Sequence, residues 1–430
     1  MSFIPSYLEQ LLELSARHGA SHSEVYRVTS QSRPISFEGN RLKQLESSSS
    51  EGTALRLWLD NRPGLAVAYG RVEPELLVEK AIALSQLNQA ETIDLVNNKQ
   101  IIYQGTEIPF ERDKLIELGN KAIALLREEY PELICSAELE WERETTTLIN
   151  SQGLQAHYSE TSLSYDLGVE LIRGDDFLGI YDGEYTKDEI NLDVVIEGII
   201  RRLDYAKYNA TPLTGTIPVL FTANAATLLW DTVAAALNGK RIWEGSSPWC
   251  DRQQDIVTSE LLTISQQPER QPYDCPFDDE GTSTQTLNLI ERGRLLQFYS
   301  DRTIARELGI QATGNGFRPD LDSYPSPSLV NLIIEPGTAS LSELITQLDN
   351  GIIIDQILGG GANISGDFSV NVDLGYRVEN GAIIGRIKDT AIANNVYQLL
   401  NQIVALGNDS VWDGFCHTPS LIVSELSVVG

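Results

Sequence analysis

The sequence predicts an α+β protein, with an N-terminal domain of helices packed on mixed or antiparallel strands and a C-terminal β-rich domain with a central buried helix. At 430 residues, the chain is too long for one ordinary hydrophobic core, so two domains are expected. Helical and strand patterns alternate in the first half, whereas strands dominate the second half. The segment Thr211–Gly215 contains Pro and Gly and interrupts both patterns, which places the domains at residues 1–212 and 213–430.

The N-terminal half repeats the order helix, strands, helix. The phrases SFEGNRLKQLESSSS and TLINSQGLQAHYSETS suggest an internal duplication near residues 100–110, although element length and turn chemistry alone would also produce this likeness. Apolar periodicity and turn residues predict helices at Pro5–Arg17, Glu75–Leu87, Glu111–Glu129 and Lys187–Tyr208, with strands within Glu24–Tyr69 and Ile134–Tyr185.

The C-terminal half opens with IPVLFTANAATLLWDTVAAALNG, in which an apolar strand becomes a helix. Val219–Phe221 is predicted as a buried strand, Thr222 or Asn224 can cap the following helix, and Gly239 is expected to end it. Apolar residues recur at helical spacing in this Ala-rich segment, which is typical of a helix that anchors a core.

Strands and tight turns follow this helix. Glu379-Asn380-Gly381 is the strongest hairpin signal, because Asn-Gly favours the tight turn between antiparallel strands. The other predictions are a hairpin around Glu291-Arg292-Gly293, helices at Asp301–Glu307, Ser340–Leu348 and Ala391–Leu406, and strands at Leu329–Pro336, Gly351–Ile357 and Leu421–Leu426.

The composition restricts the classes of partner. With 61 Asp and Glu against 32 Lys and Arg, the formal net charge is -29, which disfavours direct nucleic-acid binding and permits a basic or unfolded polypeptide partner. No apolar run approaches the roughly 20 residues that span a bilayer. The N-terminus is acidic where a signal peptide is basic, and the four Cys are scattered without a C-x-x-C pair. We therefore expect a soluble, cytoplasmic protein.

No local pattern predicts a convincing catalytic or metal site. His18 and His22 have the spacing of zinc ligands on a helix, but Gly19 lies where that helix should end. Cys416 and His417 are adjacent, whereas the members of a catalytic pair normally meet through the fold.

Two polar or glycine-rich motifs have simple structural explanations. Gly359-Gly360-Gly361 follows a strand but precedes further strands, so a backbone bend is favoured over a phosphate loop, which needs a helix N-terminus. Asp278-Asp279-Glu280 would suit a hard cation, but a solvated turn is the preferred interpretation.

Taken together, these segments resemble the TldD/PmbA (TldE) family, long labelled modulators of DNA gyrase and now regarded as a bacterial metalloprotease pair. The resemblance runs nearly the whole length of the chain. It is moderate in EVYRVTSQSRPISFEGNRLKQLESSSSEGTALRLWLDNRPGLAVAY. It is specific in FDDEGTSTQTLNLIERGRLLQFYSDRTIARELGIQATGNGFR and ILGGGANISGDFSVNVDLGYRVENGAI.

The resemblance also indicates which residues stand at the positions of the family's zinc-binding motif. TldD-type members carry H-E-x-x-x-H on the helix after Phe221, and the flanking leucines and closing glycine place Trp230, Asp231 and Ala235 at its His, Glu and His positions. TldD-type members supply a further Cys ligand near the C-terminus. Cys416 lies in that neighbourhood, but the shorter HTPSLIV segment after it has the form of TldE. The resemblance implies that this chain binds no metal and supplies no catalytic residue.

The resemblance therefore implies a non-catalytic, TldE-like subunit of a peptidase complex. Such a subunit pairs with a zinc-containing TldD-like subunit, or forms a homodimer, and helps to hold an unfolded peptide for proteolysis. Two alternatives stay open: a stand-alone peptide-binding or chaperone-like module, and a homodimeric peptidase with an unrecognised site. The peptide contacts are expected at Gly359, Gly360, Gly361, Asn363 and Ser365.

Overall fold

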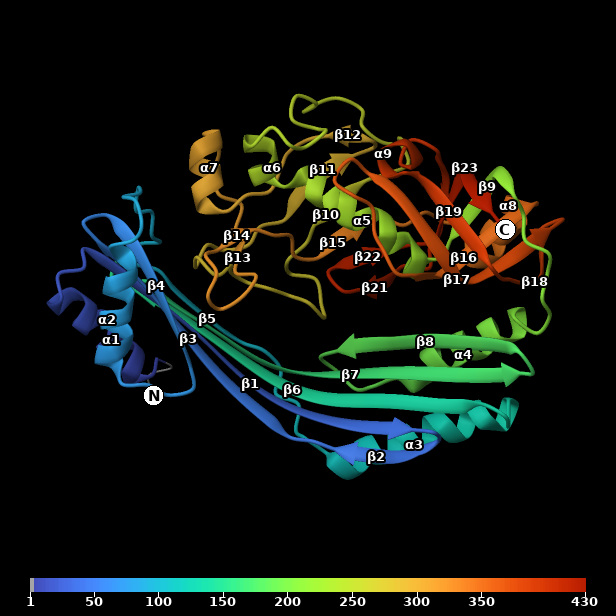
Figure 1. Ribbon diagram of the computed structural model, residues 1–430, viewed down its shortest axis with the longest axis horizontal. Helices are drawn as coiled ribbons and strands as arrows, with labels where there is room; N and C mark the ends of the chain where they lie inside the picture. Colours follow the sequence, from blue (N-terminus) through green and yellow to red (C-terminus); the bar gives the residue numbers. More distant parts are fainter. Residues whose placement is uncertain (1–3) are drawn as a thin grey trace.

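The computed structural model describes residues 4–430, which divide between one sheet built from residues 22–186 and three sheets built from residues 215–429. Figure 1 shows the long, curved N-terminal sheet lying along one side of the C-terminal half. The predicted α+β class is confirmed. Helices flank strands twice in the N-terminal half, but all of these strands join one sheet, and the internal duplication stays a prediction.

The N-terminal sheet has the strand order β4-β3-β1-β6-β7-β5, with β2 beside β1 and β8 beside β7. Its pairings are antiparallel except for that between β5 and β7. The strands are β1 (His22–Glu38), β2 (Arg41–Leu45), β3 (Ser48–Leu59), β4 (Arg62–Tyr69), β5 (Gln100–Gln104), β6 (Ile134–Asn150), β7 (Gln155–Arg173) and β8 (Asp176–Thr186).

Four helices cover the two ends of this sheet, as Figure 1 shows: α1 (Ser6–Arg17), α2 (Pro74–Ser85), α3 (Arg112–Glu129) and α4 (Leu192–Tyr205). At one end, Leu8 and Leu11 of α1 are fully buried in a core that they share with α2 and β3. At the other end, α3 packs closely on β1, because a Cβ at Gly119 would overlap the ring of Phe37. Burial of these apolar faces stabilises both ends of the long strands.

The C-terminal half contains a closed barrel with the strand order β16-β9-β23-β19-β17, which the pairing of β16 with β17 completes. Strand β18 adds beside β17, and β20 adds beside β23. The strands are β9 (Gly215–Phe221), β16 (Gly351–Leu358), β17 (Asp367–Glu379), β18 (Ala382–Ile387), β19 (Thr390–Asn395), β20 (Ile403–Leu406) and β23 (Leu421–Val429).

Helix α5 (Ala223–Leu237) follows β9 and lies between this barrel and a second sheet (Figure 1). The buried side chains of Leu229 and Val233 share one core with both layers, as predicted for a central helix. The second sheet has the order β12-β11-β10-β15-β22-β21 and contains β10 (Ile264–Gln266), β11 (Leu287–Glu291), β12 (Arg294–Leu295), β15 (Leu332–Ile334), β21 (Val411–Asp413) and β22 (Cys416–Thr418).

The remaining elements are short: α6 (Gly239–Trp243), α7 (Arg302–Leu308), α8 (Leu341–Leu348), α9 (Val396–Leu399), β13 (Gly316–Phe317) and β14 (Ser326–Pro327). The predicted helix near Ser340 is confirmed, and Ser340 and Glu343 form a reciprocal capping box at its start. The hairpin at Glu379-Asn380-Gly381 is also confirmed, with positive φ at Asn380 and Gly381. None of the helices within the described residues combines the length and apolar character that a membrane crossing requires.

Two predictions of secondary structure are wrong. Residues 391–406 form β19, α9 and β20 instead of one helix, because Ala391–Ala393 pairs with both β17 and β23 inside the barrel. Gly239 does not end α5 but is the first residue of the next helix, α6. Helix α5 stops at Leu237, and the Asn238 side chain accepts the Lys240 N–H at 2.9 Å to start α6.

Candidate functional site

A cavity of about 1910 Å³ lies between the N-terminal sheet and the C-terminal half. Residues of β8 and α4 line one side. Residues of α5, β16, β21 and the loops at 271–273 and 359–364 line the other side. Because its walls come from both halves of the chain, the relative placement of the halves creates this space.

One face of α5 lines the cavity. Asp231 and Ala235, one turn apart, line the cavity, and Thr227 lies one turn before them. Trp230 is only 1% exposed and belongs to the core, where its Nε1 donates a 2.8 Å hydrogen bond to Thr418 Oγ1. Burial, followed by the nearby charge of Asp413, raises the pKa of Asp231.

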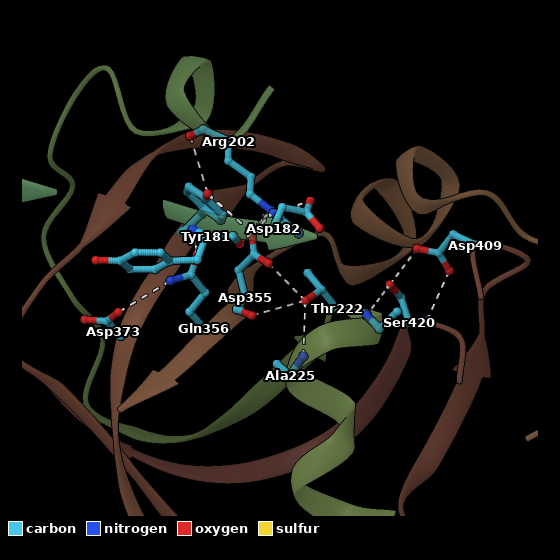
Figure 2. Close-up of polar contacts among 12 residues, drawn as sticks. Tyr181, Asp182, Arg202, Thr222, Ala225, Asp355, Gln356, Asp373, Asp409 and Ser420 are labelled. Carbon is cyan, nitrogen blue, oxygen red and sulfur yellow. Dashed lines mark hydrogen bonds and ion pairs between the residues drawn. The ribbon is translucent and has the colours of Figure 1, made fainter. Parts of the chain in front are cut away.

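The start of α5 is fixed by a polar network that joins the two halves (Figure 2). Thr222 Oγ1 accepts the Ala225 N–H at 3.5 Å, as predicted for the N-cap, and donates to Asp355 Oδ1 at 3.2 Å. Arg202 of α4 lies 3.1 Å from Asp355 Oδ2 and 2.8 Å from Asp182 Oδ2 of β8. These contacts hold α5, β16 and β8 in a fixed relation around the cavity.

The cavity also contains the free edge of β8. The Tyr181 N–H donates to Gln356 Oε1 at 3.3 Å, and the Tyr181 carbonyl accepts from Arg202 at 3.5 Å. The backbone polar groups of Tyr181 therefore point away from β7. Because this direction alternates along an antiparallel strand, those of Gly183 and Tyr185 face the same edge.

A row of aromatic side chains runs across the cavity from β8 to β22. Tyr185 stacks on Tyr273 with ring centroids 4.7 Å apart, Tyr273 meets Trp412 at 5.1 Å, and Trp412 meets His417 at 5.0 Å. All four residues line the cavity. Burial lowers the pKa of His417 to about 4, so its ring is neutral near pH 7.

The other singled-out His and Cys residues do not join this site. Cys416 is 2% exposed within the core, whereas its neighbour His417 lines the cavity, as expected for successive residues of a strand. Burial raises the pKa of the Cys416 thiol. His18 Nε2 lies 2.6 Å from Glu75 Oε1 on α2, and His22 contacts Ser21.

The glycine loop after β16 lies on the cavity wall. Gly359, Gly360, Gly361 and Asn363 line the cavity, whereas Ser365 is not among its lining residues. Gly359 and Gly360 have φ near +66° and +65°, a conformation that favours glycine and turns the chain sharply. The loop therefore has the form of a bend, and it leaves the space beside it open.

The prediction that Asp278-Asp279-Glu280 forms a solvated turn is wrong. Asp278 is fully buried and accepts the backbone N–H groups of Glu280, Thr282 and Gly316 at 2.8–3.0 Å. Glu280 Oε2 accepts the backbone N–H of Arg302 at 2.9 Å. Burial raises the pKa of Asp278 to about 7. These carboxylates are buried because they bind the backbone of converging loops, and they do not line the cavity.

The side chains around α5 do not fit a zinc ion. Ala235 has no ligand atom, and the Trp230 indole N–H can only donate. Within residues 4–430, no group of three or more His, Cys, Asp or Glu side chains is arranged to hold a metal.

No pattern in the sequence predicts the aromatic row or the cavity-facing edge of β8. Tyr185, Tyr273 and Trp412 come from separate segments in both halves of the chain, and no local motif connects them. Only the packing of the two halves brings them together.

Comparison with known proteins identifies relatives that match nearly the whole chain or about half of it. A metalloprotease PmbA homolog from Haemophilus influenzae is 23% identical over 97% of this chain and 94% of its own length. A metalloprotease TldD homolog from Buchnera aphidicola is 31% identical over 47% of this chain and 44% of its own length. The crystal structure of TldE from Thermococcus kodakarensis has a TM-score of 0.89 at 23% identity, covering 99% of this chain and 100% of that one. That structure shows a shared fold.

Two family models also match. The PmbA/TldA metallopeptidase domain 1 matches residues 23–85, and the PmbA/TldA metallopeptidase C-terminal domain matches residues 214–430. The second match covers half of the chain, including α5, the glycine loop and most of the cavity wall. The protein therefore belongs to the PmbA/TldD family of metallopeptidases.

Proposed function

We propose that this chain is a non-catalytic, TldE-like subunit that holds an unfolded peptide for a zinc-containing, TldD-type partner. The observation that carries the proposal is the cavity between the two halves, with α5 on its wall. At the positions that the resemblance assigns to the zinc motif, α5 presents Asp231 and Ala235 to this space and turns Trp230 into the core.

The free edge of β8 supports peptide binding. An extended peptide can add to an exposed sheet edge through main-chain hydrogen bonds, which need few special side chains. Residues 181–188 line the cavity, so this edge is open to an occupant of that space. At Tyr181 the edge is already covered by Gln356 and Arg202. The Gly183 N–H donates to Asp182 Oδ1 at 2.9 Å. We therefore expect a peptide to pair beyond these groups, with the Gly183 carbonyl and the backbone of Tyr185.

The glycine loop supplies the opposite wall for such a peptide. No heavy atom lies within 4 Å of a Cβ built at Gly359 or Gly361, so the backbone there is accessible. Exposed backbone amides recognise an extended chain without regard to its side chains. We expect Gly359, Gly360, Gly361 and Asn363 to contact the peptide. Ser365, an exposed polar residue that directly follows the lining segment 359–364, is expected to contact the peptide as well.

The test compares the purified chain alone with the chain mixed with a TldD-type protein from the same cell. Alone, the chain should contain no stoichiometric zinc and should cleave no unfolded peptide, whereas the mixture should cleave. Zinc at one ion per chain together with cleavage by the chain alone would contradict the proposal.

Co-purification from the native cell separates the alternatives. Recovery of a stoichiometric partner with an H-E-x-x-x-H motif supports the partner-subunit proposal. Peptide binding with no such partner supports the stand-alone module instead. Cleavage by a homodimer would support the third hypothesis, and it should then respond to substitution of Asp231, Asp279 or Glu280.

A further inference from the structure

The charge of the cavity wall is unbalanced. Among the described residues, two lining cations are already neutralised: Lys187 pairs with Glu160 and Asp274, and Arg202 pairs with Asp182 and Asp355. Several lining carboxylates form no ion pair within residues 4–430, including those of Glu138, Asp166, Glu184, Asp188, Asp231 and Asp413. The lining cations without an ion pair in the same residues are the guanidinium groups of Arg201 and Arg241. The open part of the wall is therefore acidic.

Three of these carboxylates, Asp413, Asp166 and Glu184, lie close enough to Tyr273 of the aromatic row for their charges to act on it. Asp231 on α5 and Asp413 on β21 both line the cavity, α5 packs directly against β21, and the charge of Asp413 acts on Asp231. Burial, and then the charges of Asp413, Asp166 and Glu184, raises the pKa of Tyr273 to about 12. Acidic groups from both halves of the chain thus converge on one ring.

Carboxylates beside aromatic faces form a favourable environment for an ammonium or guanidinium group. A cation over an aromatic ring is attracted by the electrons of the ring face, and a charge-assisted hydrogen bond to a carboxylate adds to this attraction. The long aliphatic stem of Lys or Arg can lie along the same apolar surface. A peptide carboxylate in this place would instead be repelled.

We propose that the cavity selects basic segments of unfolded polypeptide, with a Lys or Arg side chain lying over Tyr273 or Trp412 between the Asp231–Asp413 and Asp166–Glu184 carboxylates. The inference rests on the proposed peptide-holding function and adds the class of substrate. It also gives the aromatic row a role, because the rings provide a surface along which the basic side chain can lie between the β8 edge and α5.

The experiment measures binding of three fluorescent, unstructured peptides to the full chain by anisotropy. The peptides share one Gly/Ser framework and carry Lys, Gln or Glu at the same positions. The Lys peptide should bind on the order of tenfold more tightly than the Gln peptide, and the Glu peptide should bind most weakly. The preference should decrease as salt rises, because exposed charges are screened.

Two variants locate the effect. D231N/D413N should lose most of the preference for the Lys peptide over the Gln peptide. The matched control E79Q/E128Q removes the same charge from exposed positions on α2 and α3, outside the cavity, and should keep that preference. Y273L should also reduce the preference, whereas Y273F, which keeps the ring face, should retain it.

Each outcome has a distinct meaning. Equal affinity for all three peptides overturns the charge selection and leaves the peptide-holding function intact. An equal loss of preference in D231N/D413N and E79Q/E128Q assigns the effect to overall charge and overturns the local site. Failure of all three peptides to bind overturns both proposals.

Discussion

Arg202 Nε lies 3.1 Å from Asp355 Oδ2, and this buried contact joins α4 to a strand of the barrel. The two side chains are only 11% and 4% exposed. Removal of one partner leaves the other charge buried without compensation, so Arg202→Met should lower the free energy of unfolding by about 3–5 kcal/mol. Urea unfolding followed by circular dichroism measures this loss.

The control for this pair is Arg17→Met, which breaks the exposed contact between Arg17 and Glu13 and should have almost no effect. The double variant R202M/D355L should lose less stability than the sum of its two single variants. An R202M protein as stable as R17M would show that the contact does not hold the two halves together.

The orientation of α5 predicts the outcome of grafting the zinc motif. In W230H/A235H, the imidazole introduced at position 235 should face the cavity, whereas the one introduced at position 230 should lie in the core beside Thr418. The two imidazoles should therefore not share a zinc ion, and the protein should be less stable because a large buried side chain is lost. Elemental analysis after dialysis measures the zinc, and A235H alone is the control. One tightly bound zinc per double variant would show that α5 can present both positions to one ion.

The buried carboxylates near Gly316 predict a pH dependence of stability. Burial raises the pKa of Asp278 to about 7 and also raises that of Glu280, whereas an unfolded carboxyl group titrates near pH 4. The folded protein therefore holds protons that the unfolded chain releases. These groups should stabilise the fold less as pH rises from about 5 to about 8.

Glu280→Gln tests this sign, because glutamine still accepts the Arg302 N–H but cannot ionise. The free energy of unfolding of E280Q, relative to that of the wild type, should increase as pH rises from about 5 to about 8. Urea midpoints at both values give the difference, with the exposed E79Q as control. A constant difference across this range would show that Glu280 does not titrate there.

The open space at Gly361 predicts a selective loss of peptide binding. Gly361 lacks a positive φ, and no heavy atom lies within 4 Å of a Cβ built there. Gly361→Leu should therefore fold normally and fill part of the cavity, so that peptide affinity falls several-fold. Gly361→Ala should keep most of that affinity, because it adds one methyl group. If leucine leaves anisotropy titrations unchanged, the glycine loop does not contact the peptide.

The sequence by itself determined the local elements with strong patterns. The strand at Val219–Phe221, the cap at Thr222 and the turn at Asn380-Gly381 follow from residue type and spacing, and the structure contains all three. The same local evidence failed at residues 391–406, where apolar residues suit a helix but pair within a barrel. Periodicity could not decide this case, because long-range pairing overrides a weak helical preference.

The tertiary structure alone decided the candidate site. It turned Trp230 into the core and Asp231 into a cavity, buried Asp278 among backbone donors, and placed Tyr185 against Tyr273. These relationships join residues that are distant in the chain, so no sequence window contains them. They arise because the N-terminal sheet and the barrel bury apolar surface against each other, and that packing fixes which polar groups remain around the space between them.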